Sequence, residues 1–327
     1  MFSSFRDATC GIVYGLFVKL NCARIVPVFL LVAVAILASA EEPSDLGAKA
    51  AGGDLEAMFE LGSVAILDGR YPQARKWLEK ASTSGHAPSK AALGFLYFNG
   101  FAVEKDLKKA RELYEASARE GAHQGLNNLA HLYRYGLAGL EKDLERAVEL
   151  LQEAARKGNG FAVNTLVSIY RGHELGAPDL TKTLEWLVYG AERNDPGCLS
   201  DLAYVYQHGI NVRQDLARAV ELNRKAIAAG SVRALSNLGY LYLKGQGVKR
   251  DYAEALKLFA MASELKDDAG MINLAVMKYQ GLGCQRDVDE AFALLIKAGE
   301  QGNPQALDIL KSWKAAEEQK RTPKSND

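Results

Sequence analysis

The feature that most constrains the fold of this chain is an internal repeat. A leucine followed in most units by a small residue recurs at spacings of 32, 36, 37, 36, 36 and 36 residues, at Leu61, Leu93, Leu129, Leu166, Leu202, Leu238 and Leu274. Periods of this length are typical of solenoids, in which each unit buries its apolar face against its neighbours. The repeat therefore predicts one elongated stack, where a length of 327 residues alone would suggest two globular domains.

Other residues keep the same spacing and give the unit its expected shape. In most units a tyrosine stands four residues after the leucine and a glycine three residues after that. The leucine and tyrosine share one helical face, and the glycine can adopt the left-handed conformation that ends a helix. An aspartate follows about six residues later, where its carboxylate can accept hydrogen bonds from the start of a second helix: Asp106, Asp143, Asp179, Asp215, Asp251 and Asp287. Each unit is therefore predicted to be helix, loop, helix.

Composition agrees with closely stacked helix pairs. Gly94, Gly239 and the alanines at 110, 219 and 255 are expected to let paired helices approach closely. The chain has 30 glycines, and in many units two of them are placed to end the two helices. It has only 8 prolines, so no proline-rich linker is expected between units. Lys+Arg and Asp+Glu are 40 each, so no basic excess is available to bind nucleic acid.

The segment Tyr240–Ala255, YLYLKGQGVKRDYAEA, resembles the Sel-one-like repeat, a longer-looped relative of the tetratricopeptide repeat. The resemblance extends over about residues 45–310. It implies an all-α fold, a right-handed α/α superhelical solenoid of helix pairs. The first unit lacks the long loop, and the fourth unit departs further, with Val167 and Thr183 at the small positions and an irregular loop over Arg171–Pro178.

The repeat spacing predicts the organisation of the whole chain. We expect an N-terminal half-repeat at 41–53, a C-terminal capping helix at 304–316 and a disordered tail at 317–327. Between the ends we expect seven helix-pair repeats, at 54–86, 87–123, 124–160, 161–195, 196–231, 232–268 and 269–303.

Residues 1–40 have the features of a secretory signal peptide. Basic residues come first, thirteen apolar residues follow at 25–37, and Ala38-Ser39-Ala40 forms a small-x-small cleavage site. Cleavage after Ala40 would leave an exported, periplasmic or secreted, protein of net charge −2, because the leader contains three basic residues and one acidic residue. The alternative is an N-terminal anchor that stays uncleaved, which would be the chain's only membrane attachment.

Motifs for catalysis or metal binding are sparse. Ser263-Glu-Leu-Lys266 has the spacing of a serine–lysine nucleophile, but no partner motif accompanies it. His173-Glu174 supplies two potential metal ligands, which is too few for a site. Cys198 and Cys284 lie in different units and are expected to be small buried side chains. The sequence therefore predicts no enzyme activity, no metal and no cofactor.

The resemblance also indicates where a ligand would bind. In the tetratricopeptide fold the first helix of each pair lines the concave face, with positions one and two before the leucine and two and five after it pointing into the groove. These positions hold aromatic, amide and arginine side chains suited to peptide recognition: Phe95, Phe98, Asn127, Asn128, His131, Arg134, Asn164, Ser168, Arg171, Ser200, Tyr204, Gln207, Asn237, Tyr240, Asn273 and Tyr279.

We therefore expect a non-catalytic, exported repeat scaffold that binds a protein or peptide in this groove at the cell envelope. One alternative is a cell-wall-related protein that binds or acts on peptidoglycan or β-lactams. A second is an adaptor in the lumen of a secretory compartment.

Overall fold

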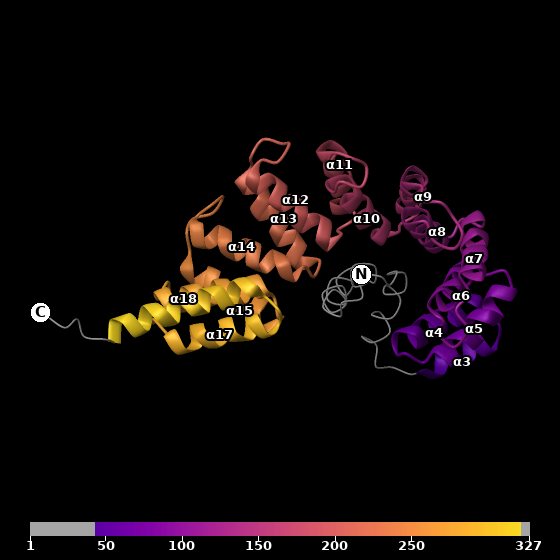
Figure 1. The fold of residues 1–327 in the computed structure, drawn as a ribbon, viewed down its shortest axis with the longest axis horizontal. Coiled ribbons are helices and arrows are strands. Elements are labelled where there is room, and N and C mark those ends of the chain that lie inside the picture. Colours follow the sequence, from indigo (N-terminus) through magenta and orange to yellow (C-terminus); the bar gives the residue numbers. More distant parts are fainter. Residues whose placement is uncertain (1–42, 322–327) are drawn as a thin grey trace, which may run out of the picture. The chain divides into compact units, whose positions relative to one another are not determined.

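The computed structural model describes residues 43–321, so the predicted signal peptide or anchor and the last six residues lie outside the described part. All regular secondary structure within 43–321 is helical (Figure 1). The helices are α3 Pro43–Ala51, α4 Leu55–Leu67, α5 Tyr71–Thr83, α6 Ala87–Asn99, α7 Leu107–Arg119, α8 His123–Tyr135, α9 Leu144–Arg156, α10 Gly160–Arg171, α11 Leu180–Ala191, α12 Pro196–His208, α13 Leu216–Ala228, α14 Val232–Lys244, α15 Tyr252–Glu264, α16 Asp268–Gln280, α17 Val288–Glu300 and α18 Pro304–Arg321.

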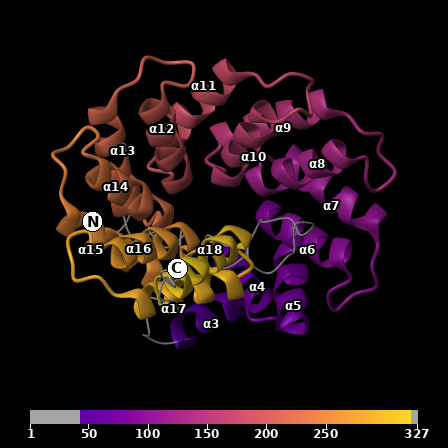
Figure 2. The same cartoon turned by 60° about the vertical axis from the view of Figure 1, so that its left-hand side comes forward.

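The chain divides into two compact units, with the boundary between Cys198 and Leu199 inside α12. We call the described parts the N-terminal unit (43–198) and the C-terminal unit (199–321). In each unit the helices pair in sequence order, for example α6 with α7 and α14 with α15. The first helices also contact one another, α4 with α6, α6 with α8 and α14 with α16 (Figures 1 and 2). The predicted all-α solenoid of helix pairs is therefore confirmed, and in each unit the first helices form the inner layer.

The aspartates that recur once per repeat were predicted to start the second helices, and this prediction is confirmed. Each carboxylate accepts a hydrogen bond of 2.8–3.0 Å from the backbone N–H three residues later. The backbone N–H of each aspartate in turn donates to a carbonyl near the end of the preceding helix. Such a cap stabilises a helix by about 1 kcal/mol. Both bonds form at Asp179 too, so the irregular fourth unit keeps its second helix in place.

The glycine that ends the first helix is the beginning of a loop with two left-handed residues. Gly100, Gly136, Gly245 and Gly281 end their helices with φ between 64° and 76°. The residue two positions later also has positive φ, whether it is alanine, asparagine or glycine. At Gly247 there is a second reason for glycine, since a Cβ would lie 2.4 Å from the carbonyl oxygen of Leu216. The loop therefore packs against the start of the second helix of the preceding pair.

The predicted close approach of paired helices is also confirmed, and its cause is a ring on the second helix. A Cβ on Gly94 would lie 2.7 Å from the Tyr114 ring, and a Cβ on Gly239 would lie 2.7 Å from the Phe259 ring. Both rings are almost fully buried. Glycine is therefore needed because the aromatic side chain occupies the space of its missing methyl group.

The C-terminal end differs from the prediction. We expected the capping helix to stop at residue 316, but α18 continues to Arg321. Glu317 explains part of this extension, because it accepts hydrogen bonds from the Tyr279 hydroxyl at 2.8 Å and from Arg286 at 2.7 Å. Sequence polarity alone suggested a frayed tail, and these two contacts give the polar residue a fixed partner.

Candidate functional site

The structure divides the predicted groove residues into two sets. The first set consists of the side chains that stand two residues before the repeated leucine, and these lie between one first helix and the next. Asn164 Nδ2 donates to Asp195 at 3.3 Å, and Ser200 is 2.6 Å from Ser231. Asp195 and Ser231 cap the next first helix, so these side chains join one repeat to the next. Asn127, at the same position in α8, is 6% exposed.

The side chains of three other predicted residues also pack against neighbouring residues. Phe95 belongs to the apolar core, where its ring lies 6.0 Å from that of Phe101. Gln207 is buried. Tyr279 stacks on Trp313 of α18 with ring centroids 4.0 Å apart. For these three the prediction of an open groove position was wrong, because the repeat register carries no information on how a neighbouring helix covers the site.

Two of the remaining predicted residues, Asn128 and His131, belong to a polar row on α8. Gln124, Asn128, His131 and Tyr135 are spaced four, three and four residues apart, so they share one face of the helix. Asn128 is fully buried, and neither its Oδ1 nor its Nδ2 has a hydrogen-bond partner. The same holds for the buried Gln124 Oε1 and His131 Nδ1. Four polar atoms without partners on one helix face are unusual in a folded protein, because each costs about 1–3 kcal/mol.

Aromatic rings surround His131. Its ring lies edge-on to Phe98 of α6 at 6.0 Å and tilted against Tyr135 at 4.8 Å. Burial, assisted by the positive charge of Arg134, lowers the pKa of His131 to about 4. The imidazole is therefore neutral near pH 7 and offers one donor and one acceptor.

Arg134 follows this row and binds an acidic residue from a distant loop. Its Nε donates to Glu174 Oε2 at 2.9 Å, and its Nη2 donates to Glu174 Oε1. Burial is the largest influence and lowers the pKa of Arg134, but the hydrogen bond to Glu174 and the charges of Tyr135 and Glu174 together raise it above its usual value. The same bond lowers the pKa of Glu174. Both groups are therefore charged across the physiological range.

The C-terminal unit presents a more open inner face. Tyr204 and Tyr240 occupy the position of His131 on α12 and α14 and are 51% and 37% exposed. Tyr204 packs on His208 with ring centroids 4.2 Å apart, and the Lys244 ammonium lies 5.6 Å from the Tyr240 ring. Asn237 and Asn273 are half-buried beside this row, whereas in the N-terminal unit Ser168 and Arg171 are exposed.

Some residues of these inner faces were missed by the sequence prediction. Five of them lie about one helical turn from the positions considered, and following the face at spacings of three and four residues would have found them: Gln124, Tyr135, His208, Arg233 and Lys244. The sixth, Asp201, stands at a position that was considered, directly before the leucine, but was not included. Asp201 and Arg233 form an ion pair between α12 and α14.

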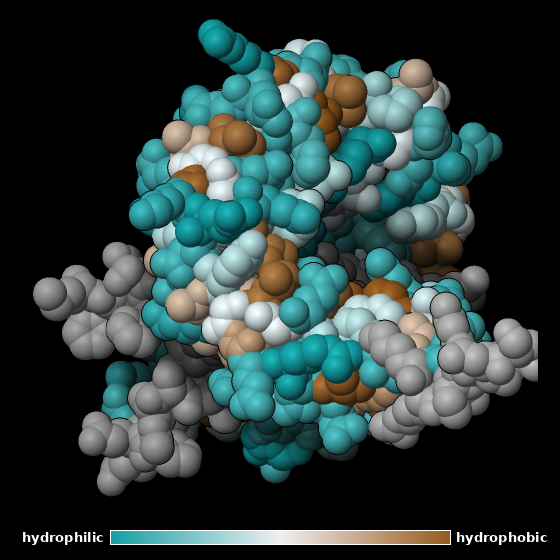
Figure 3. Space-filling view, turned by 90° about the vertical axis from the view of Figure 1, so that its left-hand side faces the viewer, coloured by the Kyte–Doolittle hydropathy of each residue, from teal (hydrophilic) through white to brown (hydrophobic). Residues whose placement is uncertain are grey.

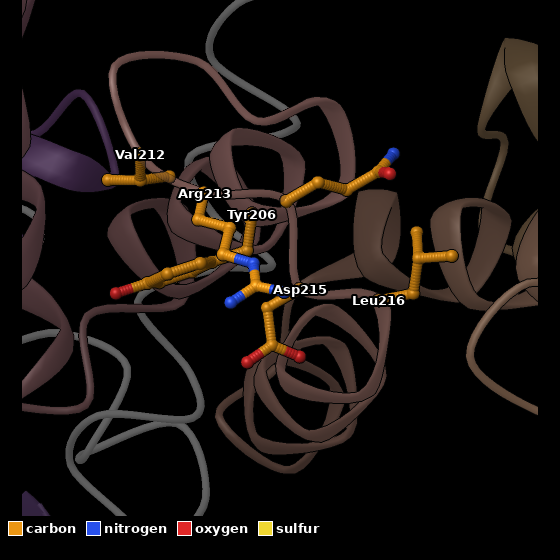
Figure 4. Close-up of a pocket in the computed structure, with 6 residues that line it drawn as sticks. Tyr206, Val212, Arg213, Asp215 and Leu216 are labelled. Carbon is orange, nitrogen blue, oxygen red and sulfur yellow. The ribbon is translucent and has the colours of Figure 1, made fainter.

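A pocket in the described residues lies elsewhere. It is an open depression of about 620 Å³ lined by the loop between α12 and α13. Figure 4 shows Tyr206, Arg213 and Asp215 at its centre. Asp215 caps α13, and the Arg218 guanidinium lies 4.3 Å from the Tyr206 ring. These side chains have structural contacts, and nothing in their arrangement forms a catalytic group.

The predicted chemical motifs are not assembled into sites. Ser263 is buried in α15, whereas Lys266 is exposed beyond the end of that helix with φ of 63°. The two residues therefore lack the helical turn that a serine–lysine pair needs. Glu174 is bound to Arg134, and no group of three or more His, Cys, Asp or Glu side chains within 43–321 could hold a metal ion. Cys198 is buried as predicted, but Cys284 is only half-buried, and the two described cysteines form no disulfide.

Surface hydropathy gives no sign of membrane insertion in the described residues. None of the helices between 43 and 321 is both long and apolar enough to cross a bilayer. The face seen in Figure 3 is mostly hydrophilic, and its apolar side chains form small separate patches. Large exposed apolar patches mark many interfaces, so recognition on this face would depend on polar contacts.

These features define an α-helical repeat scaffold whose inner helix faces carry aromatic, amide and charged side chains. Comparison with family models identifies its repeat. The Sel1 repeat model matches residues 55–86, 87–121, 123–159, 196–231, 232–267 and 268–303, which is more than half of the chain. The protein therefore belongs to the Sel1 repeat family, and the resemblance seen in the sequence is confirmed.

Solved structures agree with this assignment. One is c5321, a protective antigen of uropathogenic Escherichia coli with an SLR fold, which is 27% identical with a TM-score of 0.65. That match covers 81% of this chain but only 57% of c5321. A Sel1 repeat protein from Oxalobacter formigenes is 23% identical over 72% of this chain and 94% of its own length, with a TM-score of 0.61. A search of curated proteins found no match.

Proposed function

We propose that this protein is a non-catalytic scaffold that binds extended segments of partner proteins along the inner faces of its first helices. Family membership supports a role in protein interaction, since Sel1 repeats build solenoids whose concave surfaces bind other proteins. The irregular segment 161–195, which the family model does not match, still forms the helix pair α10 and α11. We therefore propose that this segment, the fourth unit along the chain, is a degenerate repeat, which brings the number of repeats to seven.

The observation that carries the proposal is the exposure of Tyr204 and Tyr240. Tyrosine side chains give a large contact area for little loss of conformational freedom and are frequent among the residues that dominate binding energy. They stand at the same position of successive repeats, and Asn237, which lies on the same face of α14, can pair with a peptide main chain. A row of this kind suits an extended segment.

Affinity purification from the native host with quantitative mass spectrometry tests this proposal. The Tyr204→Ala/Tyr240→Ala variant should lose at least ten-fold of its specific partner relative to wild type. Met261→Ala/Leu265→Ala is the matched control, since these two apolar residues are comparably exposed on the second helix α15 and at its C-terminal cap. Equal loss in both variants, or loss in neither, would refute recognition by the inner face.

We further propose that the protein is exported and acts at the cell envelope after cleavage behind Ala40. The basic, apolar and small-x-small pattern of the first forty residues supports this proposal. Edman sequencing of protein from the host envelope should begin at Glu41, and an intact Met1 terminus would indicate an uncleaved anchor. Absence of catalysis is tested with labelled penicillin, which should neither attach to nor be turned over by the protein.

A further inference from the structure

The loop after α10 differs from the other long loops of the protein and reaches back to an earlier repeat. Gly172, which ends α10, has φ of −83°, so this loop does not begin with the left-handed residue found at Gly100 and Gly136. The altered path brings Glu174 against Arg134, which lies 40 residues earlier on α8. The loop thus contacts Arg134, which lies beside the polar row on α8.

The pairing of Arg134 with Glu174 is the geometry in which a guanidinium recognises any carboxylate. Two parallel N–H···O bonds join the groups, one of them Nε to Oε2 at 2.9 Å. The Arg134 side chain is only 15% exposed and the Glu174 side chain 31%. Arg134 is held on a helix, whereas Glu174 belongs to a loop, so the arginine is the preformed half of this site.

The neighbouring residues of α8 require a ligand that both donates and accepts hydrogen bonds. Gln124 Oε1 and Asn128 Oδ1 are acceptors without a partner, and Asn128 Nδ2 is a donor without one. His131 Nδ1 also has no partner. A peptide main chain supplies N–H and C=O groups in alternation, so an extended segment could pair with these buried atoms if its binding opens the packing that covers them. Phe98 and Tyr135 would contact its side chains beside His131.

We propose that the inner face of α8 recognises an extended acidic segment of the partner protein, and that Glu174 occupies the place of the partner's carboxylate until an Asp or Glu side chain displaces it. The inference rests on the proposed function and adds the chemistry of the ligand. Exchange of one carboxylate for another leaves the charged hydrogen bonds of Arg134 unchanged. Net affinity therefore depends on the further contacts along α8, which makes the site selective against isolated carboxylates.

Two synthetic peptides test the proposal on the full-length protein. The first has the sequence of residues 171–178, acetyl-Arg-Gly-His-Glu-Leu-Gly-Ala-Pro-amide, and the second has glutamine in place of its glutamate. Capped ends remove any free α-carboxylate, so only the side-chain carboxylate is available. Binding is measured by NMR titration of the arginine side-chain signals in wild type, Glu174→Gln and Arg134→Gln.

The Glu174→Gln protein should bind the acidic peptide at least ten-fold more tightly than the glutamine peptide. Wild type should bind it at least ten-fold more weakly than Glu174→Gln does, because its own loop competes at high effective concentration. Arg134→Gln should not distinguish the two peptides. Arg134→Lys, which keeps the charge without the two-pronged geometry, should discriminate less than arginine and guards against misfolding of the glutamine variant.

Equal binding of the two peptides by Glu174→Gln would overturn the carboxylate site, as would equal binding of the acidic peptide by wild type and Glu174→Gln. Failure here is distinguishable from failure of the proposed function. If partner capture still depends on Tyr204 and Tyr240 while the peptides show no discrimination, the scaffold role stands and the acidic ligand is refuted.

Discussion

The inner faces of the two units use the same repeat positions in opposite ways. On α8 of the N-terminal unit Asn128 is fully buried and Arg134 is held by Glu174, and only Tyr135 at the end of the row is exposed. On α12 and α14 of the C-terminal unit the row is open, with Tyr204 and Tyr240 projecting to solvent. Both units are nevertheless built by the same aspartate caps and glycine contacts. The two units thus share one helix framework, whereas the exposure of each inner-face side chain depends on its own neighbours.

The cause of the difference is the loop that follows α10. A regular loop starts with a left-handed glycine and packs on the preceding second helix, as Gly247 does on Leu216. The irregular loop sends an acidic side chain to the preceding first helix instead. One irregular repeat can therefore place a side chain on the first helix of its neighbour without changing the helix framework.

The largest expected effect tests the shared architecture. Gly94→Ala and Gly239→Ala should each lower the free energy of unfolding by about 3 kcal/mol, because the new methyl group overlaps a buried ring. Urea denaturation followed by circular dichroism measures the effect. Gly47→Ala in α3, where a Cβ meets nothing within 4 Å, is the control and should be neutral or stabilising. A large effect in one unit alone would show that the two frameworks differ.

The covered face predicts a pH dependence that the open face lacks. The pKa of His131 is lowered to about 4 in the folded state, so the unfolded state binds more protons between about pH 6.5 and pH 4. The contribution of His131 to stability is therefore complete above about pH 6.5 and falls by about 3 kcal/mol as the pH drops to 4. Urea midpoints at pH 7 and pH 4.5 should differ less in His131→Asn than in wild type.

Helix caps should have equal, smaller effects in the two units. Asp143→Ala and Asp251→Ala each remove the carboxylate that accepts from the first turn of the second helix. We expect a loss of about 1 kcal/mol in the free energy of unfolding for each. Asp143→Asn and Asp251→Asn keep a capping oxygen and should recover most of that loss. Thermal denaturation distinguishes the pairs, and unequal losses would contradict a common helix start.

Opening the covered face should cost little stability. Glu174→Gln removes the charge of a partly exposed ion pair, which contributes about 0.5–1 kcal/mol. Its unfolding midpoint should fall slightly, and the fall should shrink in 1 M NaCl because salt screens the pair. A loss above about 2 kcal/mol would mean that the loop is a structural clamp, which would argue against its displacement by a ligand.

The framework was predictable from sequence because each repeat position has a local cause. Helix starts depend on an aspartate and helix ends on a glycine, and both are visible in the sequence. Occupancy of the groove depends on non-local contacts. The cover that Trp313 places on Tyr279 and the reach of Glu174 to Arg134 join residues 34 and 40 positions apart. The repeat period cannot encode them, since they occur where the repeat ends or degenerates.

Site-specific photocrosslinking in the native host tests the central claim most directly, namely that partners lie along the inner faces of the first helices. The crosslinking amino acid p-benzoylphenylalanine would replace Tyr204, Tyr240, Met261 or Leu265, one position at a time. Our account predicts that one defined partner is crosslinked from positions 204 and 240 and not from 261 and 265. Crosslinking of that partner from positions 261 and 265 alone would contradict it.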